Sequence, residues 1–496
     1  MASRRGGIVL ALDQGTTGTT ALAVGEDGEP RGRGYQEITQ HYPRPGWVEH
    51  DPEEIWQSVL TASTAALAQA RAEPADVRAV GITNQRETLV VWDRRTLRPL
   101  HRAIVWQDRR TAPDCDRLRE AGKEEQVRRT TGLIIDPYFT ATKLRWMVEN
   151  VEGAATAAAG TVDSWLVARL TGGRVHATDA SNASRTLLLD IGTGGWSEEM
   201  AAVFGVPLSV LPEVVTSSGE VGRTDPDAFG GVEAPISGIA GDQQAALFGQ
   251  ACLEPGMAKN TYGTGSFVLF QTGTQRVESR SGMLTTVAWL REGRLAYALE
   301  GAIFVTGAAL QWLRDELGVI QSAAEAGPLA ASVPDAGGVF MVPAFAGLGA
   351  PHWDPYARGA IVGLTRGSSK AHVVRAAVEA MAYQTADVVE AMVADAGEAF
   401  KELRVDGGAS VMDVLCQFQA DLLGIPIRRP RHVESTALGA AFLAGRGAGV
   451  WGSDGELAHL WRLDREFLPR MSRDEAGHLL DGWHRAVQRS LDWAPR

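Results

Sequence analysis

Two aspartates follow apolar stretches of the chain at points where a carboxylate could do chemistry. Asp13 comes directly after residues 8–12 and precedes a turn rich in glycine and threonine, whereas Asp242 follows residues 235–240 and precedes a helical pattern. The first position suits a ligand of Mg²⁺ beside bound phosphates, and the second suits a general base that faces a cleft. Structural roles fit as well, because aspartate satisfies the amides of turns and of helix N-termini.

A charged pair, Arg86 and Glu87, lies on a turn between two predicted strands, residues 77–83 and 88–92. Charges on such a turn are exposed to solvent by default. The pair also places hydrogen-bond donors beside an acceptor, which suits a polyol hydroxyl that both donates and accepts. The turn therefore has one structural and one functional interpretation.

Three aromatic residues and a glycine pair are further candidates. Trp106, Tyr138 and Phe267 fit either the core or the wall of a binding site. Gly407 and Gly408, between a predicted strand and a predicted helix, fit either a tight turn or the close approach of a nucleotide to the backbone. Taken singly, none of these residues separates a structural role from a functional one.

Two segments share one pattern, in which a turn rich in Gly and Thr joins two apolar strands. The first segment spans residues 8–24 and the second spans residues 257–270. Glycines let the backbone of such a turn approach a ligand closely, and consecutive amides can converge on an anion. The repeat predicts a duplicated architecture with one hairpin in each half.

Strands and helices alternate along the chain, which predicts an α/β protein of two halves. The expected boundary gives an N-terminal domain of residues 1–252 and a C-terminal domain of residues 253–496. Residues 301–317 and 372–394 are predicted to be helical. The C-terminal segment of about 45 residues is expected to form a helical tail that packs on the second half.

Composition narrows the possible classes of function. The chain has 496 residues, of which 45% are hydrophobic and 22% are charged, as in an ordinary globular protein. Its net charge of −12 disfavours binding to nucleic acid or to anionic membranes. No apolar run is long enough for a membrane span, and the N-terminus does not read as a signal peptide. We therefore expect a cytoplasmic protein with no membrane insertion.

Familiar nucleotide and metal motifs are missing from the sequence. Gly122-Lys123 is followed by Glu124, so there is no Walker P-loop, and no HRD or DFG triplet marks a protein kinase. The three cysteines lie far apart in the sequence, which excludes a disulfide scaffold and a thiolate zinc site and suits a reducing cytosol. Any handling of nucleotides must use another kind of site.

The combination of these motifs resembles the FGGY carbohydrate kinase family. Residues 138–150 (YFTATKLRWMVEN) match one family signature, and residues 347–360 (GLGAPHWDPYARGA) lie in the region of the second. Five further motifs resemble the branch of the family that phosphorylates glycerol: LDQGTT (12–17), GITNQRET (81–88), VWQDRRT (105–111), SGIAGDQQAALFGQ (237–250) and KNTYGTG (259–265). The match runs in order over residues 8–445.

The resemblance implies a duplicated ribonuclease H-like fold of the actin-type ATPases, with a nucleotide cleft between the two domains. The first domain would bind the polyol and the phosphates, and the second would bind the nucleotide. The implied reaction transfers the γ-phosphoryl group of ATP, with Mg²⁺, to a terminal hydroxyl of glycerol and gives sn-glycerol 3-phosphate. A homo-oligomer, either a dimer or a tetramer, is also expected.

Site residues are carried over from the family position by position. The residues matched to glycerol binding are Thr16, Arg86, Glu87, Trp106, Tyr138, Asp242, Gln243 and Phe267, with Asp242 as the general base. The residues matched to ATP binding are Thr16, Thr17, Gly18, Thr20, Thr264, Gly307, Gln311, Gly408 and Met412, and Asp13 matches the aspartate associated with Mg²⁺.

Three positions depart from the family pattern. Glu233 stands where sugar-bisphosphate-regulated relatives have an arginine. Thr20 stands where relatives have an arginine near the phosphates, and Met412 stands where they have an asparagine near the adenosine. Three alternatives stay open: an FGGY kinase for another polyol or sugar, a non-catalytic relative that regulates a partner, and an actin- or chaperone-like ATPase. Intact Asp13 and Asp242 oppose the regulatory relative, and the GITNQRET and GDQQ motifs would have no role in a simple ATPase.

Overall fold

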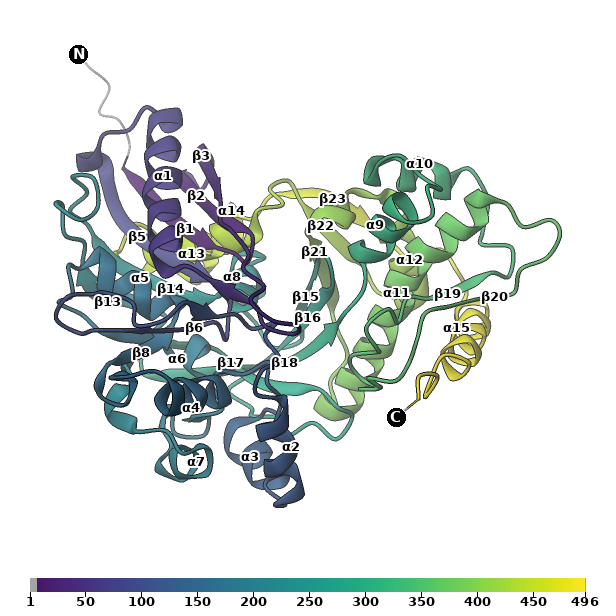
Figure 1. Ribbon diagram of the computed structural model, residues 1–496. Helices are drawn as coiled ribbons and strands as arrows, with labels where there is room; N and C mark the ends of the chain where they lie inside the picture. Colours follow the sequence, from purple (N-terminus) through teal and green to yellow (C-terminus); the bar gives the residue numbers. More distant parts are fainter. Residues whose placement is uncertain (1–6, 496) are drawn as a thin grey trace, which may run out of the picture.

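The computed structural model describes residues 7–495, which form two lobes around two separate sheets (Figure 1). The first sheet has the order β13 (Ser218–Arg223), β14 (Pro235–Gly241), β5 (Val77–Asn84), β1 (Ile8–Gln14), β2 (Gly18–Gly25) and β3 (Pro30–Glu37). The second has the order β17 (Leu284–Arg291), β18 (Arg294–Ile303), β16 (Ser266–Gly273), β15 (Met257–Tyr262), β21 (Glu402–Asp406), β22 (Ile427–Pro430) and β23 (Leu463–Phe467).

The two sheets repeat one topology. In the first, β1 pairs antiparallel with β2 and parallel with β5, and β14 lies parallel beyond β5. In the second, β15 pairs antiparallel with β16 and parallel with β21, and β22 lies parallel beyond β21. The predicted duplication, with one Gly/Thr hairpin in each half, is confirmed.

The remaining elements surround these sheets. The other strands are β4 (Glu49–His50), β6 (Leu89–Trp92), β7 (Ala103–Ile104), β8 (Ala158–Thr161), β9 (Ala177–Asp179), β10 (Leu189–Asp190), β11 (Gly195–Trp196), β12 (Glu213–Val215), β19 (Phe340–Val342) and β20 (Ala360–Val362). The helices are α1 (Pro52–Ala70), α2 (Ala112–Glu120), α3 (Glu124–Thr131), α4 (Thr140–Asn150), α5 (Val162–Leu170), α6 (Ala180–Ala183), α7 (Glu198–Phe204), α8 (Asp242–Gly249), α9 (Gly307–Asp315), α10 (Ala326–Ala331), α11 (Lys370–Ala396), α12 (Asp413–Leu423), α13 (Ser435–Gly447), α14 (Asp454–Leu460) and α15 (Arg473–Gln488).

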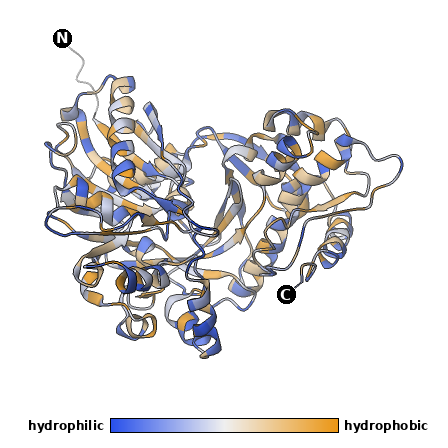
Figure 2. Ribbon diagram, viewed as in Figure 1, coloured by the Kyte–Doolittle hydropathy of each residue, from blue (hydrophilic) through white to orange (hydrophobic). Residues whose placement is uncertain are grey.

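Helices cover both faces of the first sheet, which explains the unbroken apolar run of β1. Leu10 and Leu12 belong to the core on the side of α1, whereas Val9 and Ala11 belong to the core that includes residues of α13. Successive side chains of a strand point to opposite faces, so a strand buried on both faces is apolar throughout. Figure 2 shows the hydrophobic residues along the strands and hydrophilic residues on α2 and α3.

Helix α13 comes from far along the sequence and completes the first lobe (Figure 1). A Cβ on Gly81 of β5 would lie 2.2 Å from the carbonyl oxygen of Ala440, so the helix approaches the sheet as closely as glycine permits. The chain thus returns to the first lobe after it has built most of the second. The boundary at residue 252 stays a prediction, and residues 1–6 and 496 of the two expected domains lie outside the described part.

Two expectations about local structure need correction. Residues 301–303 of the predicted helix 301–317 belong to strand β18, and the helix, α9, begins at Gly307. The tail contains α14 and α15 but also a strand, β23, that pairs with β22. Within residues 7–495, no helix has the combined length and apolar character that crossing a bilayer requires.

Candidate active site

Arg86 and Glu87 are buried, so the solvent-exposed interpretation of their turn is wrong. Glu87 has a left-handed backbone with a φ of 64°, which is uncommon outside glycine. Arg86 Nε lies 3.1 Å from Asp242 Oδ1, and Arg86 Nη2 donates to Glu300 Oε1 at 3.2 Å. The turn between β5 and β6 therefore delivers both charges to the interior, where each meets a partner from a distant element.

Two partners of this charged turn were not singled out from the sequence: Glu300, which pairs with Arg86, and Arg185, which pairs with Glu87. Arg185 Nε donates to Glu87 Oε1 at 2.7 Å, and its Nη2 donates to Glu300 Oε1 at 2.9 Å. Burial alone would raise the pKa of Glu300, but the charges of Arg185 and Arg86 lower it to about 2. Two arginines and two glutamates thus form a buried cluster, the four-charge cluster, in which opposite charges balance.

One of these two residues had a signal in the sequence. Glu300 interrupts the apolar residues of β18, and a charge in such a strand requires a buried partner. No comparable local signal marks Arg185, which lies just after the short helix α6.

Asp242 and Gln243 begin helix α8 at the end of β14. Asp242 is the first residue of the helix and not its N-cap, which is Gly241. Its Oδ1 accepts a hydrogen bond from the backbone amide of Gln243 at 2.7 Å, as well as contacting Arg86. The side chain is 31% exposed, so the carboxylate is held firmly on one oxygen and still reaches solvent.

Aromatic rings stand beside these charges. Trp106 and Tyr138 pack edge to face, with ring centroids 5.6 Å apart at 81°. The indole of Trp106 donates to Thr16 Oγ1 at 2.9 Å, and the guanidinium of Arg86 lies 5.6 Å from the centre of the Phe267 ring. The structure therefore brings the predicted aromatic residues together with the first Gly/Thr turn and with Arg86.

The first Gly/Thr turn joins β1 to β2 and includes Thr16 and Thr17. The amide of Gly15 donates to the carbonyl of Gly18 at 2.9 Å, so this amide of the turn is not satisfied by Asp13. A Cβ on Gly18 would lie 2.6 Å from the carbonyl oxygen of Gln36, which requires glycine there. Thr20 follows on β2, where it is directly opposite Asp13 in the ladder and largely buried.

The turn rests on a layer of polar side chains that sequence reasoning did not identify. Gln40 donates to the carbonyl of Thr16 at 2.6 Å and contacts His50 Nε2 at 2.7 Å. Gln85 donates to the carbonyl of Gly15 at 3.2 Å. Burial lowers the pKa of His50 to about 4, with a smaller contribution from His41, so this support stays uncharged at neutral pH.

The second Gly/Thr turn borders a cavity of about 730 Å³ in the second lobe. Its lining includes all five residues predicted to bind nucleotide in that half, namely Thr264, Gly307, Gln311, Gly408 and Met412. A Cβ on Gly408 would meet no atom within 4 Å, so this glycine opens onto free space. Drug-sized ligands occupy cavities of this size.

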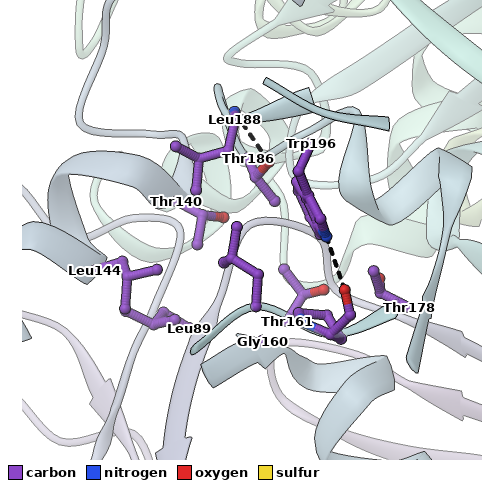
Figure 3. A pocket seen from close by; sticks show the side chains of 11 residues that line it. Leu89, Thr140, Leu144, Gly160, Thr161, Thr178, Thr186, Leu188 and Trp196 are labelled. Atoms are coloured by element: carbon purple, nitrogen blue, oxygen red, sulfur yellow. Dashed lines mark hydrogen bonds between the residues drawn. The ribbon is translucent and has the colours of Figure 1, made fainter. Parts of the chain in front are cut away.

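A small cavity in the first lobe is a contrast to this one (Figure 3). It measures about 10 Å³ and lies between Leu89, Thr140 and Trp196, whose indole donates to the carbonyl of Pro212 at 2.7 Å. Such a volume holds one water molecule at most. We regard it as a packing defect behind the site.

Comparison with known proteins agrees with this arrangement. Residues 8–249 match the N-terminal domain of the FGGY family of carbohydrate kinases, and residues 258–448 match its C-terminal domain. The chain belongs to the FGGY family of carbohydrate kinases. The family resemblance expected from the motifs is confirmed.

Full-length relatives were found within this family. A glycerol kinase of Dechloromonas aromatica is 56% identical over 500 residues, which cover 100% of this chain and 99% of the relative. A glycerol kinase of Halorhodospira halophila is 56% identical over 491 residues, with 98% and 97% covered. The crystal structure of a Plasmodium falciparum glycerol kinase with ADP superimposes with a TM-score of 0.92 at 34% identity, covering 99% of each chain.

Within the FGGY fold, the carboxylate of Asp13 is the candidate metal ligand. Its pKa is raised to about 8 by burial, by the charge of Asp242 and by Glu434, while Arg33 opposes the shift. Asp13 therefore has too little compensating positive charge around it, which suits a divalent cation. No group of three His, Cys, Asp or Glu side chains in residues 7–495 could hold a metal. Mg²⁺ fits, because it commonly binds one or two carboxylates together with substrate phosphates.

Proposed function

We propose that this FGGY kinase transfers the γ-phosphoryl group of ATP to a terminal hydroxyl of glycerol, giving sn-glycerol 3-phosphate. The observation that carries the proposal is the position of Asp242, held through Oδ1 by the amide of Gln243 and by Arg86, whose guanidinium also lies against the Phe267 ring. The glycerol kinases named above, at 56% identity over the full chain, support the same reaction.

The proposed glycerol site combines polar groups with apolar walls. Arg86 supplies donors, Glu87 and Asp242 supply acceptors, and the rings of Trp106 and Phe267 cover the carbon atoms. Each hydroxyl of glycerol both donates and accepts, so it needs both kinds of partner. Analogues that lack a hydroxyl would leave buried polar groups unpaired, which can lower kcat/KM by about 10⁴-fold.

Asp242 is the proposed general base. Among the described residues, both contacts of its carboxylate fall on Oδ1, which leaves Oδ2 for the attacking hydroxyl. As the oxygen of glycerol attacks the γ-phosphorus, its proton passes to Asp242, and the bond from phosphorus to the β–γ bridging oxygen breaks. General base catalysis of this kind contributes roughly 10²- to 10⁴-fold in rate.

The nucleotide would lie between the two Gly/Thr turns. Thr264, Gly307, Gln311, Gly408 and Met412 line the cavity proposed for the nucleoside, and Thr16, Thr17, Gly18 and Thr20 lie on the hairpin proposed to face the phosphates. Asp13 would hold Mg²⁺, which neutralises charge on the phosphate oxygens when it is bound. Positioning and neutralisation of charge are the main requirements of phosphoryl transfer.

The direct test is an assay of ADP release with MgATP and a panel of glycerol, dihydroxyacetone, erythritol, xylulose and gluconate. We expect glycerol to give the highest kcat/KM. If another compound of the panel gave a higher turnover, the proposed mechanism would stand and that compound would be the substrate. No turnover across the panel, with ATP still bound, would favour a regulatory relative.

Two expectations from the sequence accompany this proposal. A reducing compartment such as the cytoplasm suits Cys115, Cys252 and Cys416, which are buried and unpaired. A homo-oligomer, dimer or tetramer, stays a prediction that the mass of the protein in solution would test.

A further inference from the structure

Lys259 is a fully buried lysine at the edge of the proposed glycerol site, and the proposed reaction gives it no role. It lies on β15, and its Nζ donates to three acceptors: Gln243 Oε1, Thr261 Oγ1 at 2.9 Å and the carbonyl of Phe267 at 3.3 Å. Two of these three partners, Gln243 and Phe267, belong to the proposed glycerol site. Lys259 therefore touches the site from behind without being exposed to it.

The contact with Gln243 fixes the orientation of its side-chain amide. An ammonium group has three donors and no acceptor, so the atom of Gln243 that faces it must be the carbonyl oxygen. The amide nitrogen then has to point the other way. The three acceptors around the ammonium match its three N–H groups. The hydrogen bond to Gln243 is therefore not in competition with an unsatisfied donor.

We infer that Lys259 is a positioning residue, which makes the side chain of Gln243 a pure hydrogen-bond donor toward the substrate. The inference rests on the proposed function. It gives Lys259, which lies outside the site, an indirect role in the recognition of the substrate.

The consequence concerns the group that binds between Gln243 and Asp242. Asp242 offers an acceptor at Oδ2, and Gln243, turned by Lys259, offers a donor. A neutral hydroxyl satisfies both at once, because it donates to one and accepts from the other. An ammonium group would leave the donor of Gln243 unpaired, and a carboxylate would be repelled by Asp242. The pair therefore selects an uncharged alcohol.

The surrounding charges stabilise the ammonium form of Lys259. Burial lowers the pKa of Lys259 to about 8, while Asp406 and Asp242 oppose that shift and Arg86 adds to it. Asp406 is itself buried at the end of β21, and its Oδ1 has no hydrogen-bond partner among the described residues. The carboxylate of Asp406 thus compensates the buried positive charge without drawing Lys259 away from Gln243.

The first experiment measures the KM for glycerol and for ATP separately in Lys259→Met, which removes the donor and keeps most of the side-chain length. We expect the KM for glycerol to rise about tenfold or more, the loss typical of a hydrogen bond from a charged group, and the KM for ATP to stay within about twofold. The matched control is Lys401→Met, an exposed lysine that donates to the carbonyl of Pro255 at 2.9 Å, and it should change neither constant. An unchanged KM for glycerol in Lys259→Met would overturn the inference.

A second variant tests the same orientation without removing the buried amine. Gln243→Glu keeps the shape but replaces the donor with an oxygen, so the KM for glycerol should again rise about tenfold or more. When Lys259→Met is added to Gln243→Met, the KM for glycerol should rise by less than about twofold relative to Gln243→Met alone, because the amide that Lys259 orients is already gone. If the two substitutions raised the KM for glycerol independently, so that their factors multiplied in the double variant, the orienting role would be refuted. A normal KM for glycerol in Gln243→Glu would refute it as well.

The wild-type protein in the same assays separates this inference from the proposed function. If the wild type fails to phosphorylate glycerol, then the proposed function fails. If the wild type is active and the variants behave as it does, then only the role of Lys259 fails.

Discussion

Arg86 and Glu300 form a buried ion pair that joins the two lobes. Arg86 comes from the turn after β5 in the first lobe, and Glu300 comes from β18 in the sheet of the second lobe. Their side chains are almost completely inaccessible to solvent, and Arg86 uses the remaining nitrogen, Nε, for Asp242. The residue that holds the proposed base is thus itself held by the other lobe.

The first prediction is that Glu300→Gln destabilises the protein and weakens glycerol binding. Removing one partner of a buried charge pair costs about 3–5 kcal/mol, because the other charge is left uncompensated. Here two arginines, Arg86 and Arg185, lose a carboxylate. Urea unfolding and the KM for glycerol would measure the two effects.

A matched control is Glu379→Gln in α11, where the carboxylate accepts from Arg375 Nε at 2.6 Å within the second lobe. That change should lower stability and leave the KM for glycerol unaltered. A normal KM for glycerol in Glu300→Gln would show that the pair serves stability alone.

The second prediction is that Asp242→Asn retains ATP binding and loses turnover. The amide of asparagine cannot take the proton of the hydroxyl, so kcat should fall by about 10²-fold or more. Calorimetric titration with ATP and steady-state kinetics with glycerol separate the two properties. The control is Asp225→Asn, a surface aspartate that pairs with Arg174 at 2.6 Å, which should keep full turnover. Near-normal kcat in Asp242→Asn would remove this residue as the base.

Local patterns in the sequence were sufficient for much of the fold. The predicted strand 77–83 lies in β5, and the apolar stretch 235–240 lies in β14, because an apolar run that ends at a turn is a short-range signal. The duplication was visible for the same reason, since both Gly/Thr hairpins are complete within about 20 residues each.

The partners of the charged residues could not be predicted in this way. Arg185 lies 98 positions from Glu87, and Glu300 lies 214 positions from Arg86. The turn of Arg86 and Glu87 consequently had an exposed interpretation that the structure contradicts. Long-range contacts of this kind depend on how the lobes pack, and no short segment encodes them.

The third prediction concerns Mg²⁺. In Asp13→Asn the proposed ligand loses its charge, so the concentration of Mg²⁺ that gives half-maximal turnover should rise about tenfold or more. Titration of Mg²⁺ at fixed ATP and glycerol measures this, and EDTA should abolish turnover in both proteins. The control is Asp136→Asn, which pairs with Arg109 at 2.8 Å and should keep the wild-type requirement. An unchanged Mg²⁺ requirement in Asp13→Asn would exclude Asp13 as a ligand.

The fourth prediction concerns the contact that fastens the C-terminal helix, α15, to α11. Asp387 of α11 is buried, and its Oδ1 lies 3.0 Å from His484 Nε2 while its Oδ2 accepts from the indole of Trp483 at 2.8 Å. The hydrogen bond to Asp387 and then its charge raise the pKa of His484 above 6.5, although partial burial opposes this. A folded-state pKa above the unfolded value means that the protonated histidine favours the folded state.

This stabilisation is complete below about pH 6.5 and is lost as the pH rises through the folded-state pKa of His484. We therefore expect the Tm difference between the wild type and His484→Gln to be largest near pH 5.5 and to shrink toward pH 8.5. The effect should be small, because His484 is about half exposed. The control is His478→Gln, an exposed position on the same helix, which should leave Tm nearly unchanged. A difference for His484→Gln that is constant or grows with pH would show that the histidine holds the helix by packing and not by charge.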